Sequence, residues 1–81
     1  MNGLIPMKTI VTYVDNTNDQ SYEILTKEYD GFENAYIPHI GEVIVVYSEH
    51  EHDEVEFKVI EVRVLVNREY DQFDLLLERT N

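Results

Sequence analysis

Residues 55–66 alternate between apolar and charged side chains, and the alternation changes phase in the middle of the segment. Apolar residues occupy the odd positions from Val55 to Val59 and the even positions from Ile60 to Val66. Because successive side chains of a strand point to opposite faces, a regular strand would send one half of these residues to the wrong face. The strand therefore needs a β-bulge between Val59 and Ile60, or a sharp bend there that takes it from one sheet to another. Bent strands of this kind close small barrels, so the segment predicts a small all-β domain with one strongly bent strand.

Four other segments complete the expected sheet. Residues 8–14 read as a strand, with Ile10, Thr12 and Val14 on one side and Val11 and Tyr13 on the other. Residues 72–78 read as the last strand, with Phe73, Leu75 and Leu77 inward, and a near-continuous apolar run over residues 43–47 is typical of a central strand buried on both faces. Residues 21–29 fit a strand or a short helix equally, and residues 72–78 also accept a helix because Leu and Glu favour it. We therefore expect an all-β fold, with room for one short helix: about five strands, joined mainly by hairpins, in a compact antiparallel barrel.

The chain has the length of one domain. Its 81 residues are 43% apolar, which favours folding despite the high charge. Gly3 and Pro6 interrupt the first residues, so we expect a flexible N-terminal segment over residues 1–7 and a single β-barrel domain over residues 8–81. No apolar run has the length of a signal peptide or a membrane span, which favours a soluble cytoplasmic protein.

The net charge is strongly negative. Seventeen acids and six bases give −11, with an isoelectric point near 4.4. Such a surface repels phosphate backbones and anionic membranes, so the expected partner is a basic protein surface or a cation. The alternative is a charge that only keeps the protein in solution. The chain has no cysteine, which excludes a disulfide, a thiolate zinc site and a cysteine nucleophile within it.

The densest charge lies between the two Val-rich strands. Residues 49–56 contain five acids and no Lys or Arg: Glu49, Glu51, Asp53, Glu54 and Glu56. Together with acids on the connections, they could form a spaced array that resembles a nucleic-acid backbone and occupies the basic channel of a nuclease. The acids on the connections are Asp30, Glu33, Glu69, Asp71 and Asp74. The alternative is a solvated hairpin tip whose charges prevent edge aggregation.

Two histidines in the same segment are the candidate metal ligands. His50 and His52 are two residues apart, so both imidazoles would point to one side of an extended segment, with His39 or carboxylates completing the shell. A pair without a fixed third ligand is usually a solvated turn, so we predict no metal and no cofactor. Nearby carboxylates favour the charged imidazole, so the segment could change its charge between about pH 5 and 8.

Six tyrosines and three phenylalanines supply the aromatic side chains. Tyr29, Phe32 and Tyr36 surround a weakly patterned loop, where their rings could anchor a protein partner or cap one open end of the barrel. The remaining strand tyrosines are expected in the core or on its rim: Tyr13, Tyr22 and Tyr47.

Catalytic motifs are not evident. Ser21 and Ser48 stand in no nucleophile elbow, and the isolated glycines form no phosphate-binding loop. A barrel of this size also has little room for a substrate cavity of the usual few hundred Å³. We therefore expect a protein that is not an enzyme.

Two adjacent segments resemble a pattern found in small SH3-like β-barrel proteins of bacteria and bacteriophages. Residues 37–43 read Ile-Pro-His-Ile-Gly-Glu-Val, and residues 57–62 read Phe-Lys-Val-Ile-Glu-Val. In those proteins, Pro-x-x-Gly-Glu/Asp opens a strand, a tight hairpin follows, and an aromatic-x-Val-x-x-Val strand comes next. The resemblance covers the middle third of the chain and implies an SH3-like barrel and a bacteriophage or mobile-element product. It assigns no functional residues.

These observations predict a non-enzymatic acidic protein that binds a basic protein surface. A phage-encoded inhibitor of a host defence or nucleic-acid-processing protein, acting as a DNA mimic as many anti-CRISPR proteins do, would fit this description and would work in the host cytoplasm. Two alternatives remain: a metal- or pH-responsive module using His50 and His52, and a virion-associated structural protein that forms homo-oligomers through edge strands.

Overall fold

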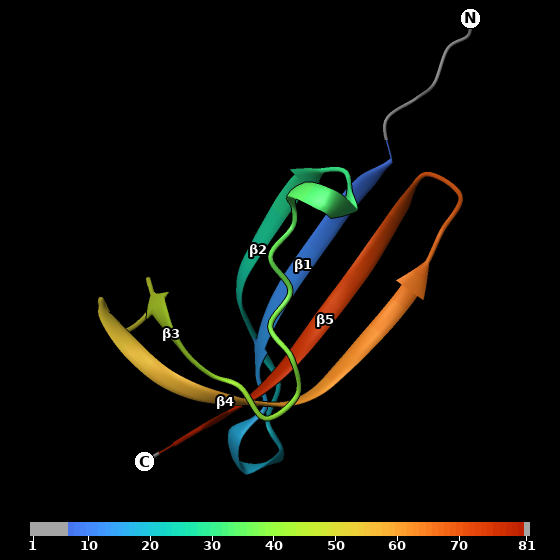
Figure 1. Cartoon of the computed structure of the whole chain (residues 1–81). Coiled ribbons are helices and arrows are strands. Elements are labelled where there is room, and N and C mark those ends of the chain that lie inside the picture. The colour runs from blue at the N-terminus through green and yellow to red at the C-terminus, as the bar shows by residue number, and fades with distance from the viewer. Residues whose placement is uncertain (1–6, 81) are drawn as a thin grey trace, which may run out of the picture.

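The computed structural model describes residues 7–80, which form one five-stranded sheet (Figure 1). The order across the sheet is β2-β1-β5-β4-β3, so β2 and β3 form its two edges. The β1–β5 pair is parallel, and the other neighbouring pairs are antiparallel. The elements are β1 (Lys8–Asp15), the 3-10 turn η1 (Thr17–Asp19), β2 (Tyr22–Asp30), the 3-10 turn η2 (Phe32–Asn34), β3 (Val43–Ser48), β4 (Asp53–Val66) and β5 (Tyr70–Arg79).

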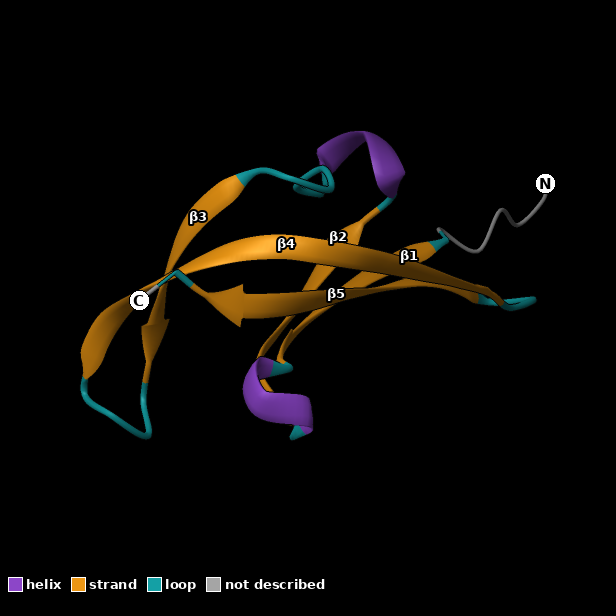
Figure 2. Cartoon of the chain, turned by 90° about the horizontal axis from the view of Figure 1, so that it is seen from below, coloured by secondary structure: helices purple, strands orange, loops and turns teal. Residues whose placement is uncertain are grey.

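The all-β prediction is confirmed. The segments left open between strand and helix form β2 and β5, and the sheet curls along the bent β4 into a half-barrel (Figure 2). The parallel β1–β5 pair departs from the fully antiparallel arrangement expected, since the first and last strands lie side by side. Residues 1–6 of the predicted flexible N-terminal segment lie outside the described residues. Residue 81, at the other end of the sequence, also lies outside them. Within residues 7–80, no helix combines the length and the apolar character needed to cross a membrane.

The core lies on the inner face of the curled sheet. Its side chains come from β1, β3, β4 and β5, and alternate residues of each strand contribute, as the period of two requires. Burial raises the pKa of the Tyr13 hydroxyl to about 12, with smaller contributions from Tyr29, Tyr36 and Glu42. The buried cluster consists of Val11, Tyr13, Val46, Phe57, Val59, Leu75 and Leu77.

The predicted bulge in β4 is confirmed. Val59 lies opposite Leu77 of β5 and Glu61 lies opposite Leu76, so Ile60 is the extra residue. The insertion returns Val62, which lies opposite the buried Leu75, to the inner face. One additional residue therefore accounts for the change of phase in the sequence.

The Pro-x-x-Gly-Glu segment fixes the start of β3 beside this bulge. Gly41 has a φ of +91°, a conformation that glycine adopts without strain, and its N–H donates to the carbonyl of Val59 at 2.7 Å. The Val59 N–H in turn donates to the carbonyl of Glu42 at 2.9 Å. The Glu42 carboxylate accepts hydrogen bonds from the Tyr36 hydroxyl and the His39 N–H, which lower its pKa. These residues have a structural role in the turn.

The expectation that residues 43–47 form a central strand buried on both faces is wrong. β3 is an edge strand, and Val43, Val45 and Tyr47 are each more than half exposed on its outer face. Only its alternate residue Val46 is fully buried in the core. A continuous apolar run is compatible with both arrangements, because the sequence does not show which strands lie on either side.

Candidate acidic interaction site

The predicted acids lie in the turn between β3 and β4 and in the first residues of β4. Residues 49–52 form a turn, in which His52 has a φ of +56° and the Glu51 N–H donates to the buried Ser48 hydroxyl at 3.3 Å. We call the five exposed acids of this segment the acidic tip: Glu49, Glu51, Asp53, Glu54 and Glu56.

Arg79, at the end of β5, joins the acidic tip to the rest of the sheet. Its Nη2 lies 2.6 Å from Glu51 Oε2, and its Nε lies 3.4 Å from Asp15 Oδ2. The guanidinium also lies over the ring of Phe57, 6.0 Å from the centroid. The hydrogen bond to Glu51 is the largest cause of the raised pKa of Arg79, with the hydrogen bond to Asp15 adding to it. Arg79 therefore holds the tip in a defined position and stays charged at any physiological pH.

Asp15 is the buried end of this network. Only 12% of its side chain is exposed, and its Oδ1 accepts the Thr17 N–H at 3.0 Å. The Arg79 N–H donates to the Thr17 hydroxyl at 2.9 Å, so the end of β1, η1 and the end of β5 share one set of polar contacts. A buried carboxylate with a cation and a backbone donor meets the usual requirement for charge burial.

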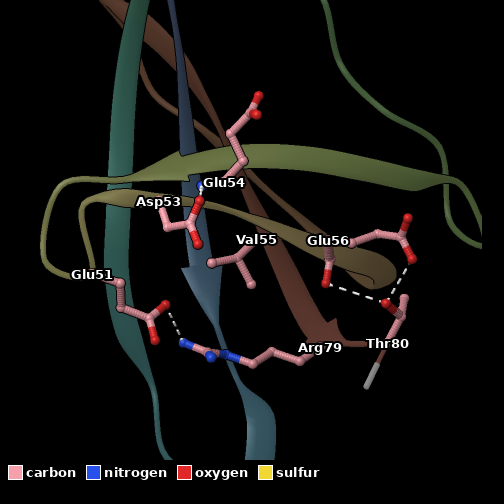
Figure 3. Close-up of a pocket in the computed structure, with 7 residues that line it drawn as sticks. All are labelled: Glu51, Asp53, Glu54, Val55, Glu56, Arg79 and Thr80. Carbon is pink, nitrogen blue, oxygen red and sulfur yellow. Dashed lines mark hydrogen bonds and ion pairs between the residues drawn. The ribbon is translucent and has the colours of Figure 1, made fainter.

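The acids line an open groove of about 740 Å³ beside the end of β5 (Figure 3). Glu51 points toward Arg79, and the Thr80 hydroxyl donates to Glu56 Oε1 at 2.7 Å, whereas Glu54 points away from both contacts. The lining residues are Glu51, Asp53, Glu54, Val55, Glu56, Arg79 and Thr80. Four carboxylates thus share the groove with a single guanidinium, and that group already pairs with Glu51 and Asp15.

A second groove of about 500 Å³ shares Glu51 and Arg79 with the first. Glu23, Glu49 and His50 add polar side chains to it, and Tyr22 and Ile24 add apolar area. The Glu51–Arg79 ion pair therefore contributes to the walls of both grooves, and each groove offers oxygen acceptors to a cationic side chain.

The histidines do not have the geometry on which the metal hypothesis depends. His50 lines the second groove, whereas His52 lies in the turn with a left-handed backbone conformation, so the segment is not extended across the pair. Among residues 7–80, no group of three or more His, Cys, Asp or Glu side chains is placed to hold a metal ion.

The predicted aromatic residues lie outside both acidic grooves. Tyr29 packs against the core, and Phe32 packs against Phe73 of β5, with ring centroids 5.8 Å apart and an interplanar angle of 44°. Phe32 and Tyr36 remain 62% and 55% exposed. Tyr36 lines a third groove, beside β3, so the structure does not join the aromatic loop and the acidic tip into one surface.

The other predicted acids lie on separate parts of the molecule. Asp30 ends β2, and Glu33 lies in η2. Glu69 lies in the β4–β5 connection, whereas Asp71 and Asp74 lie in β5, with Asp74 opposite Arg63. Of the two predicted sets of acids, only the tip converges on a groove. Sequence reasoning missed Asp15, Arg79 and Thr80, since their partners are 24 to 64 residues away. A lone arginine at the end of an apolar strand in a chain with six cations was the available signal.

Comparisons with protein-family models, curated proteins and solved structures gave no match. The function is therefore inferred from the chemistry of the surface.

Proposed function

We propose that the protein is a non-enzymatic interaction protein whose acidic tip binds a basic surface on another protein. The observation that carries the proposal is that four acids of the tip line one open groove whose single cation is already paired. The segment from Glu49 to Glu56 holds five acids, and Arg79 offsets one charge. The remaining negative charge faces solvent and attracts a cationic partner.

The ordered position of the tip favours binding over a purely solubilising role. The Glu51–Arg79 pair and the Glu56–Thr80 hydrogen bond limit the motion of the tip at both ends of the groove, so a partner loses less entropy in ordering it. A lysine or arginine of the partner can enter the groove and bind the exposed carboxylate of Asp53.

The expected class of partner is a nucleic-acid-binding protein. A channel that binds phosphates by Lys and Arg also accepts carboxylates at similar spacing, so this protein would compete with DNA for it. Inhibition of a host defence or nucleic-acid-processing protein by a phage-encoded mimic fits such competition. The support comes from the charge of −11 and the tip geometry.

The test is capture of basic proteins from a bacterial lysate on the immobilised protein, at low and at high ionic strength. The tip variant is Glu49→Gln/Asp53→Asn/Glu54→Gln/Glu56→Gln, which keeps Glu51 and its contact with Arg79. The control removes the same charge elsewhere, in exposed residues: Glu28→Gln/Asp30→Asn/Glu33→Gln/Glu69→Gln. We expect salt and double-stranded DNA to release the captured protein, and the tip variant to bind at least about tenfold more weakly than the control. Equal binding by the two variants, or capture that resists high salt, would contradict the proposal.

A further inference from the structure

Within residues 7–80, β3 pairs only with β4, and the other side of its backbone has no neighbouring strand. In β4, the Glu56 carbonyl accepts a hydrogen bond from the Thr80 N–H, on the β5 side of the strand. Because the backbone groups of successive residues point to opposite sides of a strand, the N–H and C=O groups of the odd-numbered residues around Glu56 point toward β3. Val46 of β3 lies opposite Val55, and the two strands are antiparallel, so the even-numbered residues of β3 bond to β4. The N–H and C=O groups of the alternate residues point away from the sheet. These residues are Val43, Val45 and Tyr47.

The free edge of β3 lacks the sequence features that usually prevent an edge strand from pairing with another strand. β3 reads Val-Ile-Val-Val-Tyr-Ser, with no charge, no proline and no register shift against β4. β4 continues past the end of β3 and there pairs with β5 alone. This part of β4 contains Glu61 and Arg63, which form an ion pair at 2.7 Å. The net charge of the chain is −11, and each of the other described strands contains charged residues. Among the described strands, β3 alone has none, and its only ionisable side chain is Tyr47.

We propose that β3 pairs with β3 of a second copy, antiparallel about a twofold axis at Val45. In this register, Val45 lies opposite its own symmetry mate, and Val43 lies opposite Tyr47 of the other copy. All three residues present free backbone groups, so each pair exchanges two hydrogen bonds. Their side chains share the outer face, and Val43 against Tyr47 is a favourable pair of a β-branched and an aromatic residue.

The fit to itself identifies a second copy as the occupant. The exposed row is Val-x-Val-x-Tyr, with 53%, 59% and 55% of the three residues exposed, and the twofold operation places it on an identical apolar row. A basic partner strand would find no carboxylate on β3 to bind. A strand pair of this length buries less than the roughly 1,200 Å² of a standard interface, so we expect a reversible dimer that forms at high protein concentration.

The two proposals respond to salt in opposite directions. Two chains of like charge repel each other, and salt screens this repulsion, so self-association should strengthen as ionic strength rises. Binding of a basic partner at the acidic tip should weaken under the same conditions. A monomeric protein that captures basic partners would overturn only the dimer, and a dimer that captures none would overturn only the proposed function.

Disulfide trapping tests the register. The chain has no cysteine, so Val45→Cys introduces a single thiol. Val64→Cys is the matched control, because Val64 is also exposed, at 54%, and lies on the stretch of β4 that β3 does not cover. Residues opposite each other in a hydrogen-bonded antiparallel pair lie about 5.5 Å apart between Cα atoms, within the range for a disulfide. We expect Val45→Cys to form a covalent dimer about tenfold or more faster than Val64→Cys, since pairing raises the effective thiol concentration. Equal rates, or a faster rate for Val64→Cys, would overturn the proposal.

Sedimentation of the cysteine-free protein at rising concentration gives an independent measurement. We expect a shift from monomer to dimer in high salt, which Val45→Lys abolishes and Val64→Lys retains, because a lysine on the pairing strand blocks the edge. Both changes are at exposed positions, and circular dichroism checks that each variant keeps its strands. A wild-type protein that stays monomeric in high salt, or a dimer lost only in Val64→Lys, would overturn the assignment to β3.

Discussion

The two halves of β4 have similar sequences and different environments. Before the bulge, Phe57 and Val59 are 1% and 0% exposed, whereas Val64 and Val66, after it, are 54% and 81% exposed. The first half has β3 on one side and β5 on the other, and the second half has only β5. Burial in this strand therefore depends on the number of neighbouring strands, since both halves place their apolar residues on the inner face.

The difference separates the structural part of the strand from the part available to other molecules. In the first half, apolar side chains contact residues from β1, β3 and β5 and contribute to folding. In the second half, Val64 and Val66 keep much of their surface in water, so they contribute little to stability.

The largest effect is expected from truncation of Phe57. Phe57→Ala removes a fully buried ring from the centre of the core, and such changes cost about 3–5 kcal/mol of unfolding free energy. Since a domain of this size is only marginally stable, we expect a variant that is largely unfolded in mild urea. Urea titration followed by circular dichroism gives the value.

The matched change in the second half is Val66→Ala. Its side chain is mostly exposed, so the expected change in unfolding free energy is below about 0.5 kcal/mol. A cost above about 2 kcal/mol would show that something covers this end of β4 in solution, and the contrast between the two halves would then disappear.

Much of this fold could be predicted from the sequence, because alternation reports which face a residue belongs to. The change of phase between Val59 and Ile60 predicted a bulge or a bend, and the structure has a bulge there. The alternation over residues 72–78 placed Leu75 and Leu77 inward, and both are buried in the core. The exposure of β3 and of the second half of β4 could not be predicted. Exposure depends on which strands pair, and the pairing of β1 with β5 joins residues about 60 positions apart.

The candidate site was predictable in its charges and not in its geometry. Residues 49–56 already showed a cluster of acids, and a turn between two strands had to place them on the surface. The groove forms only because Arg79 arrives from the end of the last strand and pairs with Glu51 and Asp15. These two contacts of Arg79 join residues that are 28 and 64 positions apart in the chain, so they leave no local pattern in the sequence.

An intermediate effect is expected from Arg79, which lies opposite Phe57 of the first half of β4, when it is compared with Arg63 of the second half. Arg79→Met leaves the buried Asp15 without its cation, and we expect a loss of about 1 kcal/mol, reduced by the partial exposure of the guanidinium. Arg63→Met breaks the exposed pair with Glu61 in the second half and should leave the melting temperature almost unchanged, because water and salt screen that pair. Thermal unfolding of both variants at the same ionic strength makes the comparison. Equal losses would show that Asp15 does not depend on Arg79.

The smallest effect at neutral pH, and the most specific one, is expected from Tyr13. Its hydroxyl has a pKa of about 12 in the folded protein because the core removes it from water, whereas the unfolded chain has the ordinary value of about 10. Between these two values the unfolded state loses this proton and the folded state keeps it, so stability falls as pH rises from about 10 to 12. Tyr13→Phe should match the wild type near pH 7 and lose less stability over that interval, which melting temperatures measured at several alkaline pH values would show. The other five tyrosines are present in both proteins, so the difference isolates Tyr13. Parallel pH profiles would mean that water reaches Tyr13, and hence that β3 and the first half of β4 do not close over the core as the structure shows.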